Sequence, residues 1–175
     1  RLDRLISDIS QASRIDVELN QILPDPSYLD ELIKNWVTVS QDRHPAIIIE
    51  MDITQDRVPV RMFSSRIVQV LDNLLQNAVS FSPKSGTITI SLSVEDGMAK
   101  IIMQDEGPGI PPAKINAIFD RFYTERPEGE AFGNHSGLGL SISRQIAEAH
   151  KGQLYAENPS EGGARFVLCL PLAPI

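Results

Sequence analysis

The sequence has a single cysteine, Cys169, so no disulfide can form within the chain, which fits a reducing compartment. It has no apolar run near the length that a bilayer requires, and no positively charged start followed by the apolar core of a signal peptide. The formal net charge is −7 and the basic residues are dispersed, which argues against nucleic acid or an anionic membrane surface as the main partner. An anionic ligand would therefore need a local site.

What is present suits a globular domain with an appendage, because 42% of the 175 residues are hydrophobic. Residues 1–19 carry apolar side chains at steps of three and four, as in a helix that packs on a partner helix: Leu2, Leu5, Ile9 and Ala12. Residues 20–26 contain two prolines and are predicted to be a linker, followed by a domain over 27–175. The chain begins inside a helical pattern and without Met, so we expect a fragment of a longer protein.

Two helices and two strands are predicted in the first half of this domain. We expect a helix that begins at a Ser27 cap and buries one apolar face, namely Leu29, Leu32, Ile33, Trp36 and Val39. Strands are predicted within 45–53 and 58–63, and a second helix begins from a cap at Ser64 or Ser65.

The second half supplies the rest of a sheet. Further strands are predicted within 86–96, 98–107, 152–159 and 163–172. The first two are joined by a turn around Asp96 and Gly97, and the last contains Cys169 as a small core residue. Residues 111–136 are rich in charge, Gly and Pro and are interpreted as a lid, and a helix over 137–151 should end at a Gly152 cap. This order favours an α/β (α+β) fold, a two-layer sandwich with helices on one side of a mixed, largely antiparallel sheet.

The helix before residue 82 has two distinct faces. Its core face spans an arc of roughly 140° and comprises Ile67, Val70, Leu71, Leu74, Leu75 and Ala78. A polar stripe lies beside that face and comprises Arg66, Gln69, Asn73, Asn77 and Ser80. Asn73 and Asn77 are four residues apart, so their amide oxygens face one point, which suits Mg²⁺ together with phosphate oxygens. The alternative is a pair of solvated asparagines.

The stretch "DEGPGIPP" places a carboxylate where a predicted strand ends. Asp105 is followed by Gly107 and Gly109, whose lack of a side chain would allow a flat ring to approach the backbone. A carboxylate there can accept a hydrogen bond from an exocyclic amine such as that of adenine. The alternative is a tight turn with a capping aspartate. Phe119, Phe122 and Tyr123 are either lid aromatics or ordinary packing residues.

The stretch "GNHSGLGL" runs from Gly133 to Leu140, directly into the predicted helix over 137–151. A glycine-bearing loop that gives its backbone N–H groups to an anion at a helix N-terminus has this form, and so has an ordinary turn before a surface helix. The order of this stretch after the two earlier ones favours the phosphate-binding alternative.

Four stretches in order resemble the N, G1, F and G2 boxes of the ATP-binding domain of sensor histidine kinases. They read "DNLLQNAVSFSP", "DEGPGIPP", "IFDRFYTERP" and "HSGLGLSISRQIAEAHKG". More narrowly, "RLISDISQASRIDVEL" and "NHSGLGLSISRQ" are similar to the alphaproteobacterial envelope-sensing kinases of the ChvG type. The resemblance implies a sandwich of the Bergerat ATP-binding type, with residues 1–19 as the end of the second helix of a dimerisation and phosphoacceptor hairpin.

The resemblance also implies roles for individual residues. Asn77 would be the main Mg²⁺ ligand, with Asn73 beside it at the phosphates. Asp105 would accept a hydrogen bond from the adenine amine, and the glycines around residue 138 would bring the lid's end to the phosphates. The implied ATP-binding set is Asn73, Asn77, Ser80, Phe81, Asp105, Gly107, Gly109, Ile110, Phe122, Ser136, Gly137, Leu138, Gly139 and Leu140. Phe119 and Phe122 would hold the lid to the body of the domain.

Three positions depart from the family's pattern. Ser80 replaces a common lysine, Thr124 a common arginine and His135 a common glycine. Phosphoryl transfer depends on cations around the γ-phosphate, so another cation is expected to substitute. Arg126 is the favoured candidate over Lys84 and Arg121.

The implied function is that of the catalytic domain of a two-component sensor histidine kinase. It would bind Mg-ATP and donate the γ-phosphoryl to a histidine on the missing hairpin helix of the same or a partner subunit, for relay to a response regulator. None of His44, His135 and His150 lies in a phosphoacceptor pattern, so this chain should not phosphorylate itself, and His150 is expected to be a cation at a helix C-terminus. The full protein would be a homodimer in the inner membrane with this portion in the cytoplasm. The alternatives are a degenerate nucleotide-binding module, a serine kinase, or an Hsp90-like or gyrase-like ATPase.

Overall fold

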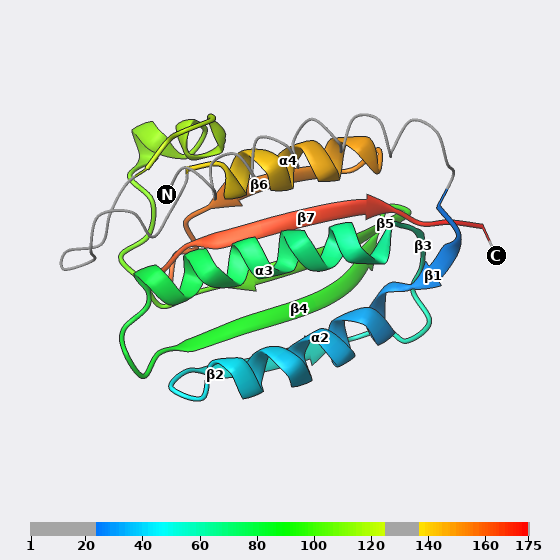
Figure 1. Ribbon diagram of the computed structural model, residues 1–175, viewed down its shortest axis with the longest axis horizontal. Coiled ribbons are helices and arrows are strands. Elements are labelled where there is room, and N and C mark those ends of the chain that lie inside the picture. The colour runs from blue at the N-terminus through cyan, green and yellow to red at the C-terminus, as the bar shows by residue number, and fades with distance from the viewer. Residues whose placement is uncertain (1–23, 125–136, 175) are drawn as a thin grey trace, which may run out of the picture.

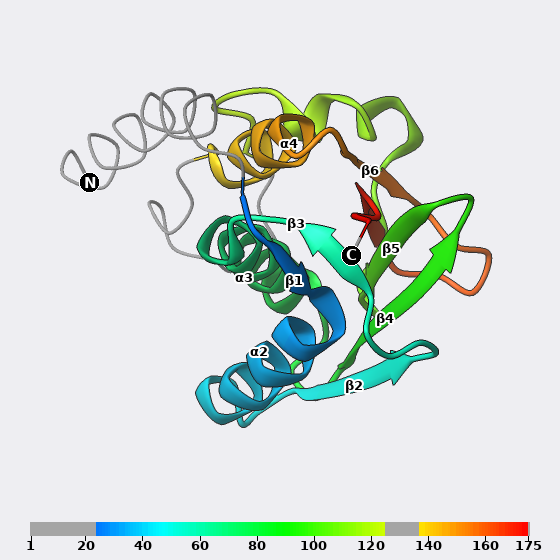
Figure 2. The ribbon, with the colours of Figure 1, turned by 90° about the vertical axis from the view of Figure 1, so that its right-hand side faces the viewer.

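The fold has two layers, a five-stranded sheet and three helices, in the computed structural model, which describes residues 24–124 and 137–174 (Figure 1). The helices are α2 (Leu29–Arg43), α3 (Ser64–Phe81) and α4 (Gly139–Ala149), with short 3-10 turns at Pro112–Lys114 and Ala117–Phe119. The strands are β1 (Pro26–Tyr28), β2 (Ile48–Ile53), β3 (Pro59–Arg61), β4 (Thr87–Glu95), β5 (Met98–Gln104), β6 (Gln153–Glu157) and β7 (Arg165–Pro171). The side view shows α2, α3 and α4 on one side and strands β2, β4, β5 and β6 on the other (Figure 2).

The main sheet has the strand order β2-β4-β5-β7-β6. Strand β2 is parallel to β4, from the pair Ile48 and Thr87 to the pair Ile53 and Leu92, and the remaining neighbours are antiparallel. The hairpin between β4 and β5 turns at Asp96 and Gly97, both with positive φ, as the sequence predicted. The predicted two-layer sandwich with a mixed, largely antiparallel sheet is therefore confirmed.

Helix α3 lies at the centre of the helical layer. The six residues predicted for its core face are its buried residues, and none is more than 3% exposed. They pack against alternate residues of the sheet such as Ile88, Ile90 and Met103, which face the helices because side chains alternate along a strand. Amphipathic periodicity was sufficient to place this helix.

A second, two-stranded sheet was not predicted. Strand β1 pairs with β3 from Pro26 and Arg61 to Tyr28 and Pro59, so regular structure already begins at the last residue of the predicted linker. The predicted Ser27 cap is wrong, because Ser27 lies in β1 and α2 begins after Tyr28 with no side-chain cap.

The start of α2 is instead joined to the segment before β3. The N–H of Leu29 donates to Val58 O at 2.9 Å, and the Asp30 carboxylate accepts from Val58 N at 2.9 Å. Trp36 is buried as predicted and donates from Nε1 to Asp72 on α3 at 2.8 Å. Val39 was expected on the core face but is 48% exposed, so that part of the prediction is wrong.

Two further helix ends differ from their predictions. Helix α3 begins after Phe63 and uses no serine cap; the Phe63 N–H donates instead to His150 Nε2 at 3.1 Å. Helix α4 ends at Ala149, and the left-handed residue after it is Lys151, with φ of 59°, not Gly152. Gly152 is needed for close packing, because a Cβ there would lie 2.1 Å from Cys169 O.

Some predictions fall on residues outside the described ranges, namely the leading helix over 1–19, most of the linker, and the lid beyond residue 124. Within residues 24–124 and 137–174, no helix combines the length and apolar character needed to cross a bilayer.

Candidate nucleotide-binding site

The loop that follows β5, residues 105–110, carries the first predicted site residue and is called the Asp105 loop here. Asp105 is only 2% exposed, although it is an acid. Its backbone N–H donates to Ala164 O at 3.0 Å, and its Oδ1 accepts from Gly107 N at 2.8 Å and Ala164 N at 3.0 Å. Burial raises the pKa of Asp105 above its ordinary value, against the opposing effect of these two N–H donors. No other described residue bonds to its Oδ2.

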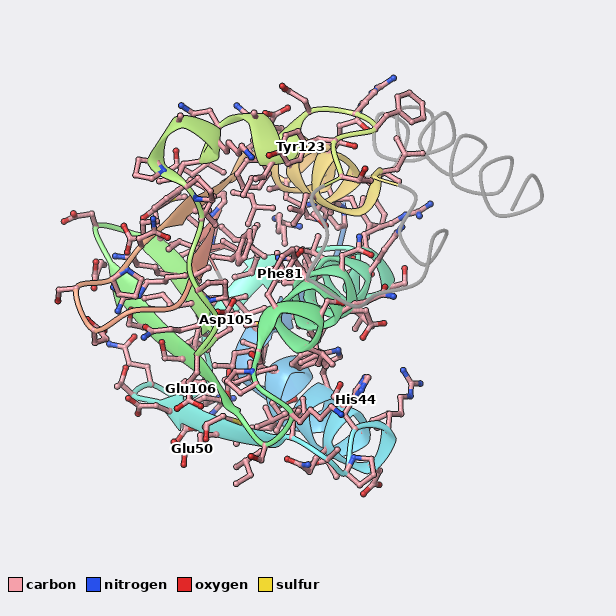
Figure 3. The ribbon with its side chains drawn as sticks, turned by 90° about the vertical axis from the view of Figure 1, so that its left-hand side faces the viewer. His44, Glu50, Phe81, Asp105, Glu106 and Tyr123 are labelled. Atoms are coloured by element: carbon pink, nitrogen blue, oxygen red, sulfur yellow. The ribbon has the colours of Figure 1, made fainter. Side chains whose placement is uncertain are left out.

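The Asp105 loop packs tightly on the end of α3. A Cβ at Gly107 would lie 2.7 Å from Phe81 O and 2.9 Å from Asp105 Oδ1, so only glycine fits there. Figure 3 shows Asp105 and Phe81 close together, between Tyr123 and Glu106. The N box and the G1 box therefore meet at this point, as the resemblance implied.

The turn between β6 and β7, residues 158–164, supports the other side of the loop and is called the β6–β7 turn. Gly163 has φ of +79°, and a Cβ there would lie 1.9 Å from Asp105 O. Gly109 also has φ of +79°, and a Cβ on it would lie 3.0 Å from Gly163 O. The left-handed backbone and the close approach both require glycine at these two positions.

Asn158, at the start of this turn, was missed by the sequence reasoning. Its Oδ1 accepts from Ile110 N at 2.8 Å, and its Nδ2 donates to Ile110 O at 2.6 Å. Asn158 lies 48 residues after Ile110 in the chain, and no motif marks it. The only signal available was its place before the Gly162-Gly163 pair in a predicted turn.

Asn73 joins α3 to the beginning of α4. Its Nδ2 donates to Gly139 O at 3.0 Å and to Ser143 Oγ at 3.1 Å. These two bonds fix the orientation of the amide, so only its oxygen can act as a cation ligand. Asn77 and Ser80 are half-buried, as expected for a stripe beside the core.

The aromatic residues of the predicted lid divide into two groups. Phe119 is 7% exposed, packs edge-on against Phe166 with ring centroids 6.4 Å apart, and has the Arg144 guanidinium 5.7 Å from its ring centroid. It holds its segment to the body, as predicted. The Phe122 side chain is 58% exposed, so the prediction that it does the same is wrong.

The backbone of Phe122 nevertheless connects two segments of the chain. Phe122 has φ of +67°, and its N–H donates to Gly137 O at 2.9 Å. Gly137 has φ of +72°, and a Cβ there would lie 2.8 Å from the carbonyl carbon of Phe122. Leu138 is 3% exposed and packs in the core, and α4 begins at Gly139 with Leu140 half-buried. The predicted site residues Ser136 and Arg126, and His135, lie outside the described residues.

His150 differs from its prediction. It is buried, its Nδ1 is 2.7 Å from Ile146 O, and its Nε2 accepts from Phe63 N. This pattern requires a neutral ring with the proton on Nδ1. Burial lowers the pKa of His150, so the expected helix-terminal cation is absent. Cys169 is buried, as predicted.

A cation at this site would depend on amide oxygens. Within the described ranges, no group of three or more His, Cys, Asp or Glu side chains could hold a metal ion. The described site residues thus offer a buried carboxylate beside α3, and Asn73 bonded to the start of α4 with Asn77 one turn further along α3.

Comparisons with known proteins agree with this geometry. The model of the family described as histidine kinase-, DNA gyrase B-, and HSP90-like ATPase matches residues 63–174. The chain is 48% identical to the sensor protein ChvG of Agrobacterium fabrum, in an alignment that covers 99% of this chain and 31% of ChvG. It therefore spans about a third of the length of that relative.

Two solved structures share the fold. The mycobacterial sensor histidine kinase MprB matches with a TM-score of 0.74 and 29% identity, over 87% of this chain and all of that one. The histidine kinase ThkA, in complex with the response regulator protein TrrA, matches with a TM-score of 0.73 and 26% identity, over 97% of this chain and 48% of that one. The chain thus belongs to the histidine kinase-, DNA gyrase B-, and HSP90-like ATPases, as an ATP-binding domain similar to those of sensor histidine kinases.

Proposed function

We propose that this chain is the part of a two-component sensor histidine kinase that binds Mg-ATP and presents its γ-phosphoryl group. The observation that carries the proposal is the buried Asp105 carboxylate, whose Oδ1 is held by two backbone N–H groups. Its Oδ2 is then left to accept a hydrogen bond from an exocyclic amine. A carboxylate kept out of water without an ion pair is expensive, which favours a binding role over a structural one.

The residues present fit adenine on one side and a cation with phosphates on the other. Gly107 and Gly109 let the Asp105 loop pack directly on Phe81 and on the β6–β7 turn, because a Cβ at either position would meet atoms of those segments, and this packing sets the position of the carboxylate. On the phosphate side, Asn77 and Asn73 would contribute amide oxygens to Mg²⁺, which suit a hard cation that keeps several waters. Bound Mg²⁺ would neutralise charge on the phosphates during transfer.

The phosphate side depends on residues from two helices. Asn73 bonds to Gly139 O and therefore fixes the start of α4 relative to α3. The proposed phosphate contacts come from Ser136 to Leu140, with Ser80 nearby and Arg126 as the cation that replaces the missing lysine. These contacts position the γ-phosphoryl and compensate its charge, which is most of what phosphoryl transfer requires of a protein.

The acceptor would be a histidine on a hairpin helix outside this chain, in the same or a partner subunit. Residues 1–19 would be the end of that hairpin and residues 20–26 the linker to the catalytic domain. The phosphoryl group would pass to an aspartate of a response regulator, a partner class that ThkA was solved with. The whole protein would be a homodimer anchored in the inner membrane, with this domain in the cytoplasm.

The Asp105→Asn variant tests nucleotide binding directly. Asparagine can keep Oδ1 as the acceptor for Gly107 and Ala164 but places a donor where the amine should donate. We expect ADP affinity, measured by calorimetry, to fall by about 10- to 100-fold, which corresponds to one lost charged hydrogen bond and one unsatisfied donor. Stability should be unchanged or higher at pH 7, because a buried charge is removed. Unchanged ADP affinity in this variant would refute the proposed role of Asp105.

A nucleotide-binding module without transfer activity is the second candidate, favoured by the departures at Ser80 and Thr124. A longer piece of the protein that includes the hairpin separates the two functions. Phosphate transfer from Mg-ATP to histidine supports the kinase, whereas nucleotide binding without transfer supports the module. The 175-residue chain alone should bind nucleotide and remain unphosphorylated.

A further inference from the structure

Both ends of the Asp105 loop are held by the β6–β7 turn. At the beginning, Asp105 and Ala164 are joined by two hydrogen bonds of 3.0 Å, one to the backbone and one to the carboxylate of Asp105. At the end, the side chain of Asn158 bonds both backbone groups of Ile110, at 2.8 and 2.6 Å. One turn therefore determines where the loop leaves the sheet and where it ends.

The Asn158 side chain pairs with the backbone of Ile110 in the way that a residue of a neighbouring β-strand would. An amide offers one acceptor and one donor side by side, and it pairs here with the N–H and C=O of Ile110 as a neighbouring backbone would. The approach is close, since a Cβ at Gly109 would lie 3.0 Å from Asn158 Oδ1. Asn158 thus packs closely against Gly109 and is hydrogen-bonded to Ile110, two successive residues of the Asp105 loop.

We propose that Asn158 is a positioning residue for adenine nucleotides, which sets the Asp105 loop in its binding geometry before the nucleotide arrives. A loop with two glycines has a large conformational entropy when it is free, and ordering it on binding would weaken affinity. Because Asn158 already holds Ile110 in the free protein, less conformational entropy is lost when the nucleotide binds. This inference rests on the proposed function, because it concerns the same nucleotide site.

Asn158 has little part in the stability of the domain. It is exposed, and it lies outside the hydrophobic core. Strands β6 and β7 remain joined by the register pairs from Gln153 and Cys169 to Glu157 and Arg165 when its side chain is removed. The midpoint of thermal unfolding should therefore stay within about 4 °C of the parent value.

Two variants and two controls test the proposal by calorimetry with ADP. Asn158→Ala removes both bonds, and the isosteric Asn158→Asp removes the Nδ2 donor and sets an oxygen against Ile110 O. We expect ADP to bind about three- to tenfold more weakly to both, the loss of one or two exposed hydrogen bonds. Ser160→Ala and Ser160→Asp change the same turn, the latter with the same added charge. Both should bind ADP as the parent does, because the one hydrogen bond of Ser160 Oγ among the described residues goes to Glu161.

Amide hydrogen exchange of Ile110 in the nucleotide-free chain supplies a readout that does not depend on binding. Its protection should fall in Asn158→Ala and stay unchanged in Ser160→Ala. A parent chain that does not bind ADP overturns the proposed function and, with it, this inference. If the parent chain binds ADP and both Asn158 variants bind it as tightly as the parent does, the positioning role alone is overturned.

Discussion

Alanine at Gly163 should destabilise the domain through two separate effects. The backbone is left-handed there, with φ of +79°, which disfavours a side chain by about 1–2 kcal/mol. The new Cβ would also lie 1.9 Å from Asp105 O, whereas real Cβ contacts are at least 3.0 Å. Asp105 cannot move away freely, since its N–H is bonded to Ala164 O. Such overpacking adds about 1–3 kcal/mol, so the expected loss in the free energy of unfolding is about 2–5 kcal/mol.

Two other glycines separate these effects. Gly162 has φ of +98°, and no atom of the described residues lies within 4 Å of the place that a Cβ would take, so Gly162→Ala should show only the backbone effect of about 1–2 kcal/mol. Gly152 is not left-handed, but its Cβ would lie 2.1 Å from Cys169 O, so Gly152→Ala should show only the packing effect of about 1–3 kcal/mol.

Urea unfolding followed by circular dichroism and by the fluorescence of Trp36 measures all three losses. Coincident transitions by the two probes, with equal dependence on urea, would justify comparing the free energies of unfolding. ADP affinity should fall in Gly163→Ala alone, because only that substitution displaces Asp105. Equal destabilisation by the adjacent substitutions Gly162→Ala and Gly163→Ala would refute the reasoning from the Asp105 contact.

Two further predictions concern α4. Burial lowers the pKa of His150 below its ordinary value of 6.5, so below pH 6.5 the unfolded chain binds a proton that the folded chain does not. The contribution of His150 to the free energy of unfolding is therefore complete above pH 6.5. It is lost as the pH falls, by at most about 1.4 kcal/mol per pH unit. Urea unfolding between pH 5 and 8 should show a weaker acid dependence in His150→Gln, and an unchanged dependence would contradict the assignment. Asn73→Asp places a carboxylate oxygen against Gly139 O and should reduce the free energy of unfolding by about 1–3 kcal/mol. A variant as stable as the parent in the same assay would show that the hydrogen bond from Asn73 to Gly139 contributes little.

Features set by a repeating local pattern were predictable from the sequence. The six buried residues of α3 and the alternation along β4 follow from periods of 3.6 and 2, and these periods locate the core. The resemblance to sensor histidine kinases, which rests on four motifs in order, implied that Asp105, Gly107 and Phe81 belong to one site, and the structure brings these three residues together.

Features set by contacts between distant segments were not predictable. Ser27 and Ser64 lie near the beginnings of helices, but neither caps one. Helix α2 begins with the Leu29 N–H bonded to Val58 O, and α3 begins directly after Phe63, and local rules connect neither Val58 nor Phe63 with capping. Asn158 is an ordinary turn residue in the sequence, and only the fold brings it to Ile110. Likewise, Gly152 looks like a helix cap, but its role is the close approach to β7.

The supports of the proposed site belong to two separate parts of the fold. Asn158 and the β6–β7 turn of the sheet hold the loop that would form the proposed adenine side, whereas Asn73 joins α3 to α4 where the proposed phosphate side would lie. A defect in the first support should weaken AMP and ADP binding by the same factor, because both carry adenine. A defect in the second should spare AMP relative to ADP. Since the two supports share no residue, their effects on the free energy of ADP binding should add in the double variant of Asn158→Ala and Asn73→Asp. If the double variant deviates from that sum by well beyond about 0.5 kcal/mol, the two sides are coupled through the nucleotide or the core.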